Sequence, residues 1–489
     1  MRLSPVGVLA ACLVSGCAVG PAYKRPPALG AAAVPAEFGD AEVASAVEWK
    51  AAGAGAPRLR GAWWELFEDA ELSRLEALAA AQNQQVAVAL ANHDEAQAAV
   101  RVARADFFPQ VNGAPSATRQ RGSANNSPGD SGAGGRTFSL FNVSADASWE
   151  LDLWGRIRRG TEGARDRAVA SAEDLDAARL SVQAEVGLDY FTLRALDAES
   201  RLLADTAAVY RRALELTRNR RQSGVASALD VAQAETQLRA VEAQIPAVDL
   251  QRAQTRHALA VLCGEAATGF GLNTNSVAGT NLPAIPRSVP SEWLESRPDI
   301  AAAERRMAAA NADVGVAQAA FYPRVLLNGS AGLESVSAST LFDWPSRFWA
   351  VGPSLQWPLF TGGRTRAQLT SAKAAYAGAV AGYRQIVLQA FQDVEDRLAA
   401  DRLLASQLQG EAAALEAARR ALDISNNRYK AGVAAYLDVV AAQTAVLGHE
   451  QNVVQLRGQR LAAGISLIKA LGGGWDNPGR RSSNGAVAE

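Results

Sequence analysis

Two short stretches of the chain, SGVASALDVAQAETQL and AGVAAYLDVVAAQTAV, place an aspartate at the same point of a matching pattern. Asp230 and Asp438 each follow a Gly-Val pair and a leucine, and they lie 208 residues apart. In a symmetric assembly such carboxylates could form a ring around one axis, where they would select cations. They could equally complement the positive end of a helix dipole in a first helical turn. Both interpretations are open at this point.

The residue types most used in catalysis and metal binding are scarce. The three histidines lie far apart without ligand spacing (His93, His257 and His449), and Cys263 stands alone beyond the leader. We therefore expect no disulfide framework, no zinc site and no cofactor. Glu150 and Asp152 have no accompanying nucleophile or phosphate loop, which disfavours an enzyme. The balance of 49 basic and 50 acidic residues disfavours nucleic acid as a partner.

The first residues predict export from the cytoplasm. MRLSPVGVLAACLVSGC joins a basic Arg2 to a short apolar run and ends in small residues before Cys17. This run is typical of a signal peptide and is too short to span a bilayer as a mature helix. Its ending resembles a bacterial lipobox, so we expect residues 1–16 to be removed and Cys17 to carry lipid. The alternative is ordinary signal cleavage beside a chance cysteine.

The chain is a tandem duplication. Trp149 aligns with Trp357 and Gly155 with Gly363 at the same offset of 208 that links the two aspartates. Upstream, FFPQV and FYPRV align at an offset of 214, and a Gly/Ser/Asn-rich loop sequence lies where the six-residue difference must fall. We expect repeats over residues 63–265 and 297–472, joined by a linker over 266–296. A lipidated arm over 17–62 precedes them, and a flexible tail over 473–489 follows.

Each repeat contains segments whose polarity alternates with the period of a β-strand. In Phe141–Leu153 the odd positions are apolar and the even positions are polar, and Trp349–Leu359 repeats this pattern with smaller or polar residues at its even positions. We expect β-hairpins over about 109–153 and 323–360, with strands of roughly 9–13 residues, the length that crosses a membrane. Aromatic residues gather at the strand ends, as in an interfacial girdle. The alternative is a soluble hairpin that packs one face on a core.

Four strands are too few to close a barrel, and open sheet edges are not viable in hydrocarbon. Either the strands are soluble, or several chains contribute them to a shared barrel. Three copies would supply roughly twelve strands, which lies within the range of known closed barrels.

Long helical patterns follow each pair of strands. Apolar residues recur with 4-3 spacing after both Val182 and Val387, which predicts coiled-coil packing. Gly224 and Gly432 suit left-handed helix ends, so we expect helical hairpins with tips near residues 224 and 432. Ser227 can cap the returning helix, whereas its counterpart Ala435 cannot.

With these features together, the chain resembles the TolC-like outer-membrane factors of tripartite efflux systems, in the NodT-type lipoprotein branch. The resemblance covers essentially the whole mature chain and is carried by CAVGPAYKRP, WWELFEDAELSRL, SRPDIAAAERRMAAANADVGVAQAAFYPRV and the paired tips. It implies a mixed fold of α-helices and membrane β-strands in a homotrimer. Each half would give two strands to a 12-stranded β-barrel and long helices to a coiled-coil α-barrel tunnel.

The function implied by this resemblance is passive export of drugs or other small molecules through a gated tunnel. The protein would lie in the bacterial outer membrane, lipid-anchored and membrane-spanning, with a periplasmic helical extension. Its partners would be a periplasmic adaptor and an inner-membrane pump of the resistance-nodulation-division type. Two alternatives stay open: an exit duct for proteins or metal ions, and a structural envelope lipoprotein that conducts nothing. The second would not need four amphipathic strands with aromatic ends.

The resemblance also assigns functional positions at the hairpin tips. Family gate residues map onto Asp230, Asp438 and Tyr429, and adaptor-contacting positions map onto Gly224, Val225, Gly432 and Val433. Ala434 and Ala441 stand where some members carry a basic residue and a further aspartate, so the closing network is thinner here. Arg220 and Arg428, four residues before each tip glycine, are the candidate replacements.

Overall fold

The computed structural model describes residues 19–28, 62–121, 123, 137–272 and 297–473. These residues belong to two compact units. The first combines Met1–Pro26, Asn92–Ala172 and Ala302–Tyr383, and the second combines Pro27–Ala91, Glu173–Ala301 and Arg384–Glu489. Each unit therefore takes segments from both halves of the sequence.

Most elements of the first half have a counterpart in the second half, and the bounds of the two differ by one of the two sequence offsets. At 214 residues, α3 (Gln84–Ala105) corresponds to α7 (Pro298–Ala319), and β1 (Gln110–Arg121) corresponds to β3 (Arg324–Ser335). At 208 residues, α4 (Arg156–Gln222) corresponds to α8 (Arg364–Lys430), and α5 (Ala228–Leu262) corresponds to α9 (Tyr436–Ala470). The remaining elements are η2 (Trp63–Phe67), α2 (Ala70–Gln82), β2 (Thr137–Leu151), η3 (Ala338–Thr340), η4 (Trp344–Ser346) and β4 (Arg347–Gln356). The tandem duplication predicted from the sequence is confirmed.

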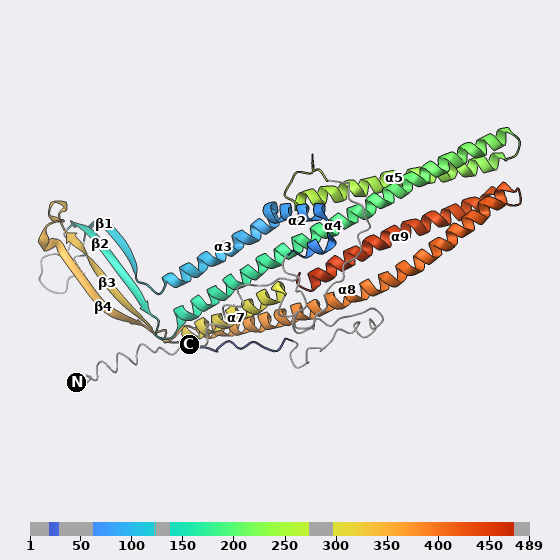
Figure 1. Cartoon of the computed structure of the whole chain (residues 1–489). Helices are drawn as coiled ribbons and strands as arrows, with labels where there is room; N and C mark the ends of the chain where they lie inside the picture. Colours follow the sequence, from blue (N-terminus) through green and yellow to red (C-terminus); the bar gives the residue numbers. More distant parts are fainter. Residues whose placement is uncertain (1–18, 29–61, 122, 124–136, 273–296, 474–489) are drawn as a thin grey trace. The chain divides into compact units, whose positions relative to one another are not determined.

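The first unit contains one antiparallel sheet in the order β1-β2-β3-β4 (Figure 1). Its register places the apolar odd positions on one face, because Trp149 pairs with Leu327 and Leu327 pairs with Pro353. On the other face, Ser148 Oγ donates to Asn328 Oδ1 (3.0 Å), and Asn328 Nδ2 donates to Ser354 Oγ (2.8 Å). The predicted period of two is thus present in space, with polar side chains bonded across three strands.

The sheet is open within a single chain. Among the described residues, β1 and β4 each have one hydrogen-bonded neighbour, so each presents one unpaired edge. In the same residues, none of the helices combines the length and apolar character that a membrane span requires.

A short N-terminal segment packs within the first unit. The backbone N–H of Val19 donates to the Trp154 carbonyl (3.0 Å), and Asn311 Nδ2 donates to the Pro21 carbonyl (3.0 Å). Gly20 lies so close to Gly315 that a Cβ on Gly20 would meet the Gly315 Cα at 2.6 Å. The segment is therefore held along α7 by contacts of its backbone, at a separation that requires glycine at position 20.

The sequence before the first strand predicts one helical stretch over Ala70–Phe107 that ends at a proline, but the structure divides this stretch into two helices. Asn83 has an extended backbone between α2 and α3, and its Oδ1 accepts hydrogen bonds from the N–H groups of Gln85 and Val86. Its Nδ2 donates to the carbonyl of Leu262, at the end of α5 (2.8 Å). The expectation of a continuous helix was wrong because a contact with a distant residue stabilises the break.

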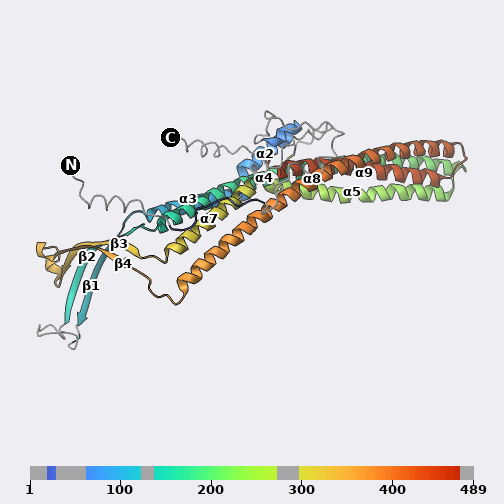
Figure 2. The same cartoon turned by 90° about the horizontal axis from the view of Figure 1, so that it is seen from below.

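The second unit has its main core beside η2 and α2. Trp63, Leu72, Tyr190 and Ile465 are among its fully buried residues. Asp69 caps α2 by accepting from the N–H groups of Glu71 and Leu72, and it also accepts from the Tyr190 hydroxyl (2.6 Å). The WWELFED segment therefore fixes α2 against α4. Figure 2 shows the helices of this unit from below.

Glu76 of α2 is a buried acid without a partner. Its exposed fraction is 0%, and neither carboxylate oxygen accepts a hydrogen bond. Arg74 donates instead to Glu71, at 2.7 Å. Burial raises the pKa of Glu76 to about 9, so this side chain is protonated at neutral pH.

We predict that Glu76 makes the protein less stable as the pH rises. Its folded pKa of about 9 exceeds the ordinary unfolded value, so folding stability falls between roughly pH 4.5 and pH 9, by at most about 1.4 kcal/mol per pH unit. Glu76→Leu should flatten this dependence, which thermal unfolding between pH 5 and 9 measures. Glu65→Gln, at an exposed glutamate of η2, is the matched control. Equal pH profiles for wild type and Glu76→Leu would contradict the prediction.

Candidate functional site

The two helical hairpins end in the same backbone motif. Gly224 and Gly432 have φ angles of +76° and +74°, in the left-handed region that glycine adopts without strain. The N–H of Val225 donates to the Arg220 carbonyl (2.9 Å), and the N–H of Val433 donates to the Arg428 carbonyl (3.0 Å). These bonds close α4 and α8 as Schellman ends, so the predicted glycine helix caps are correct.

The returning helices begin differently in the two halves. Ser227 Oγ accepts from the N–H of Asp230 (3.2 Å), and Asp230 Oδ2 accepts from the N–H of Ser227 (2.9 Å), which is a reciprocal capping box. Ala435 supplies no side-chain cap to α9. Asp438 is exposed in the first turn of α9, and its carboxylate forms no hydrogen bond or ion pair with a described residue.

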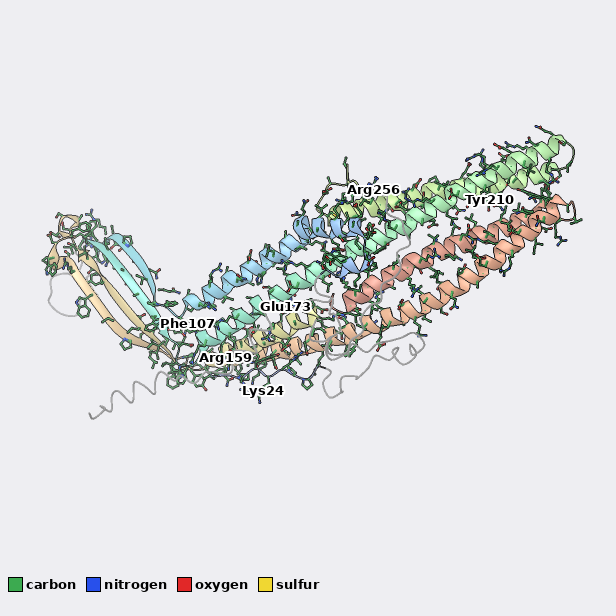
Figure 3. The ribbon with its side chains drawn as sticks, in the orientation of Figure 1. Lys24, Phe107, Arg159, Glu173, Tyr210 and Arg256 are labelled. Atoms are coloured by element: carbon green, nitrogen blue, oxygen red, sulfur yellow. The ribbon has the colours of Figure 1, made fainter. Side chains whose placement is uncertain are left out.

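A shared core joins the two hairpins near their tips. Tyr210, Leu214 and Val231 of the first hairpin pack in one cluster with Tyr436 and Val439 of the second. Two polar contacts cross between α5 and α9: Gln237 Nε2 donates to Thr444 Oγ1, and Gln451 Nε2 donates to Gln244 Oε1, both at 3.0 Å. Figure 3 shows Tyr210 on α4 in this part of the molecule. The hairpins are therefore held together along the segment that leads to the tips.

Arg220 and Tyr429 connect α4 with α8 directly. The Arg220 guanidinium carbon lies 4.8 Å from the centre of the Tyr429 ring, within the range of a cation–π interaction. The Tyr429 ring also contacts Tyr436, with centroids 5.2 Å apart. Burial raises the pKa of Tyr429, the positive charge of Arg220 lowers it, and the negative charge of Asp230 raises it. The Tyr429 hydroxyl is buried without a hydrogen-bond partner.

The gate positions inferred from the sequence thus separate into two groups. Arg220, Tyr429 and Asp230 come together at one place. Asp438 and Arg428 are exposed and do not join them. Tyr436 was missed, although it stands where the first repeat has Ala228, and this aromatic difference between the repeats was a usable signal.

The tips present four exposed apolar side chains. The exposed fractions are 65% for Val225 and Leu229, 66% for Val433 and 56% for Leu437. Such side chains grouped on a surface commonly mark a site of protein contact. The predicted lipidation residue, Cys17, lies outside the described residues. Within the residues that are described, no group of His, Cys, Asp and Glu side chains could hold a metal ion.

Most of the chain matches a known protein family. The sequence profile of a family described as "Outer membrane efflux protein" matches residues 75–265 and 289–473. The chain belongs to the outer membrane efflux protein family. It is accordingly a component of the outer membrane, where it serves as the exit duct of an efflux pump.

Relatives match the chain over nearly its full length. Outer membrane protein OprJ of Pseudomonas aeruginosa is 35% identical over 488 residues, with 97% of each chain covered. The toluene efflux pump outer membrane protein TtgF of Pseudomonas putida is 32% identical over 481 residues, with 98% of each covered. Among solved structures, the outer-membrane channel OprN is similar with a TM-score of 0.84 and 30% identity, covering 94% of this chain and 99% of that one.

We predict that the two tip aspartates contribute unequally to tip stability. Asp230→Ala removes half of a capping box and should destabilise the first turn of α5 by about 1 kcal/mol. Asp438→Ala loses no side-chain bond and should change α9 by less than about 0.5 kcal/mol. Hydrogen exchange of the amides in these two turns measures the difference. Equal acceleration of exchange in both variants would contradict the prediction.

Proposed function

We propose that three copies of this chain close one conduit whose periplasmic end is gated by the hairpin tips. The observation that supports this most strongly is the open sheet, which has an apolar face and an unpaired edge on each side. In a membrane both edges need hydrogen-bonding partners. The β4 edge of one copy can pair antiparallel with the β1 edge of the next. Three such joints complete a twelve-stranded barrel.

The gate is the contact between Arg220 and Tyr429. It joins α4 to α8 at the tips, so the two hairpins cannot separate there without losing it. A cation–π interaction contributes about 0.5–2 kcal/mol, which is small enough for the binding of another protein to offset. Asp230 lies close enough to raise the pKa of Tyr429 and thereby adds a negative charge to the same site.

The exposed apolar tips are the surface for that other protein. Val225, Leu229, Val433 and Leu437 form matching pairs on the two hairpins, so one partner can dock similarly on both. We assign this role to a periplasmic adaptor that couples the conduit to an inner-membrane pump of the resistance-nodulation-division type. The pump supplies the energy, and this chain catalyses no reaction. Its cargo is drugs or other small molecules.

The lipid on Cys17 anchors the N-terminal arm. Val19, two residues later, is bonded to the Trp154 backbone where β2 gives way to α4. Metabolic labelling with radioactive palmitate should mark the wild-type protein and not Cys17→Ser. Equal labelling of both would contradict lipidation at Cys17.

Single-channel recording in planar bilayers tests the gate. Arg220→Ala and Tyr429→Ala each remove the cation–π contact and should raise the mean conductance at least twofold. Tyr429→Phe keeps the ring and loses a hydroxyl that has no partner, so its conductance should equal that of wild type. Arg428→Ala, at the exposed arginine of the same helix end, is the matched control.

Two results would contradict the gate. Either Arg220→Ala conducts as wild type does, or Tyr429→Phe opens the channel as much as Tyr429→Ala. The second result would assign the closing contact to the hydroxyl group rather than to the ring.

A further inference from the structure

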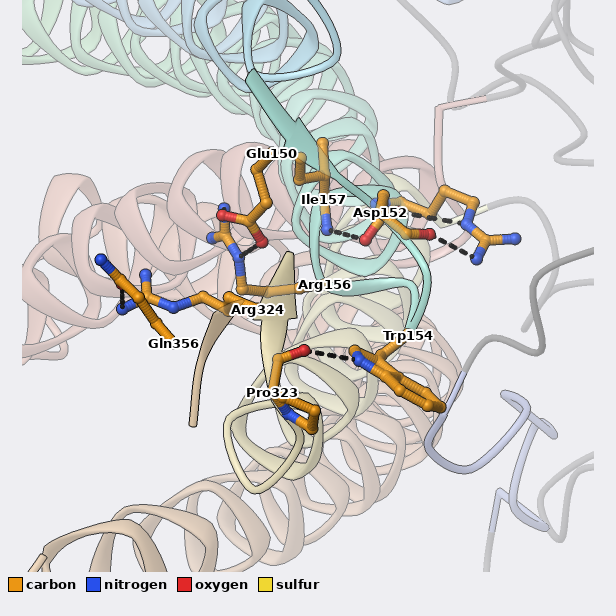
Figure 4. Close-up of polar contacts among 9 residues, drawn as sticks. Glu150, Asp152, Trp154, Arg156, Ile157, Pro323, Arg324 and Gln356 are labelled. Carbon is orange, nitrogen blue, oxygen red and sulfur yellow. Dashed lines mark hydrogen bonds and ion pairs between the residues drawn. The ribbon is translucent and has the colours of Figure 1, made fainter. Parts of the chain in front are cut away.

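The junction between strand and helix occurs twice in the chain, and the two copies differ in charge. In the first, the carboxylate of Glu150 accepts two hydrogen bonds from the Arg156 guanidinium, at 2.8 and 3.0 Å (Figure 4). Asp152 accepts from the N–H groups of Ile157 and Arg158, at 3.0 and 2.9 Å, and forms an ion pair with Arg158. Both arginines of this junction are neutralised.

The second junction has lost both acids. At the offset of 208 residues, Pro358 replaces Glu150 and Phe360 replaces Asp152, whereas both arginines are kept as Arg364 and Arg366. These arginines are exposed, and neither forms an ion pair with another described residue. The second junction therefore carries positive charge without carboxylate partners.

A cavity of about 560 Å³ lies between the two junctions, within the first unit. Its lining includes Trp154, Tyr322 and Trp357, and also Thr365, which stands between the two unpaired arginines. The rings of Trp154 and Tyr322 stack with centroids 4.9 Å apart, and Trp154 Nε1 donates to the Pro323 carbonyl (2.7 Å). These contacts fix the Trp154 and Tyr322 side of the lining.

Arg324 and Arg156 are the two arginines of the cavity lining, and in the described part of the chain only Arg156 is paired with a carboxylate, that of Glu150. Arg324 Nη2 donates to Gln356 Oε1 at 3.4 Å, and no carboxylate pairs with it among the described residues (Figure 4). The two acids of the lining are already engaged, Glu150 by Arg156 and Asp152 by Arg158. An anion entering the cavity would therefore meet a guanidinium whose remaining N–H groups can donate to it.

Arg324 lies on the polar face of the sheet. Arg324 pairs with Gln356 in the sheet register, in phase with Asn328, Ser354 and the other residues of the polar face. In the closed barrel that we propose above, on which this inference rests, that face lines the water-filled interior. The cavity is then accessible to material passing through the conduit.

We propose that this cavity is a transit site for small amphipathic organic anions. The anionic group pairs with Arg324, and the apolar body packs against Trp357 and Tyr322. The volume lies in the range of about 300–1,000 Å³ that accommodates small molecules, and aromatic walls with a few polar groups are typical of such sites. The positive charges of Arg364 and Arg366 at the second junction attract the anion. Because the anion makes one strong contact, with Arg324, it can leave the cavity again.

Blocking of single channels by a defined solute tests the site. Naphthalene-2-sulfonate added to wild-type channels in planar bilayers should cause brief current blocks whose frequency rises with its aqueous concentration. Naphthylmethylammonium, a cation with the same rings, should cause few. Arg324→Gln keeps a side chain that can bond to Gln356, and it should shorten the blocks about tenfold because one charge-assisted hydrogen bond is lost.

Arg347→Gln is the matched control, at the opposite end of the sheet, where Arg347 lies over the Trp344 ring. Its block durations should equal those of wild type. Equal blocking by the anion and the cation, or unchanged blocks in Arg324→Gln, would overturn the proposal. Blocks whose frequency does not depend on the sulfonate concentration would also overturn the proposal. Such blocks would come from a lipid in the cavity rather than from the added anion. A complete absence of channels would instead contradict the conduit itself.

Discussion

The unpaired edges of the four-stranded sheet are the constraint on which the rest of the structure depends. A backbone N–H or C=O without a partner costs several kcal/mol in hydrocarbon, so β1 and β4 cannot both end against lipid. The alternation of polar and apolar side chains cannot separate lipid from water while the edges of the sheet are unpaired. It becomes useful once the edges of neighbouring copies meet, because the apolar face then turns to the membrane and the polar face encloses water.

Duplication explains the architecture, and divergence between the repeats explains two of the proposed sites. The two halves supply equivalent strands and hairpins, with helix bounds that coincide at an offset of 208 residues. The proposed gate and the proposed transit site arise where the copies differ. Tyr436 in place of Ala228 brings a ring against Tyr429, beside Arg220. Pro358 and Phe360 in place of Glu150 and Asp152 leave arginines without acids at the second junction.

Much of the fold could be predicted because its signals are local. The period of two in β2, the 4-3 spacing in α4 and the tip glycines depend on short-range geometry, and the structure contains each of these features. The failures involve distant partners. Asn83 divides a helix through a bond to Leu262. Arg220 was a candidate on spacing alone, but its contact with a ring 209 positions away was not visible in the sequence.

The most direct test of the central claim is disulfide trapping between the two free edges in native outer membranes. Cysteines would be scanned along both strands in pairs, starting from Ala114 of β1 and Ala350 of β4, and the cross-linked products would be separated by mass. The account predicts a ladder of products that ends at three chains, with the bonds formed between different copies. Cross-links confined to one chain, or a pore-forming species that proves to be a monomer, would contradict it.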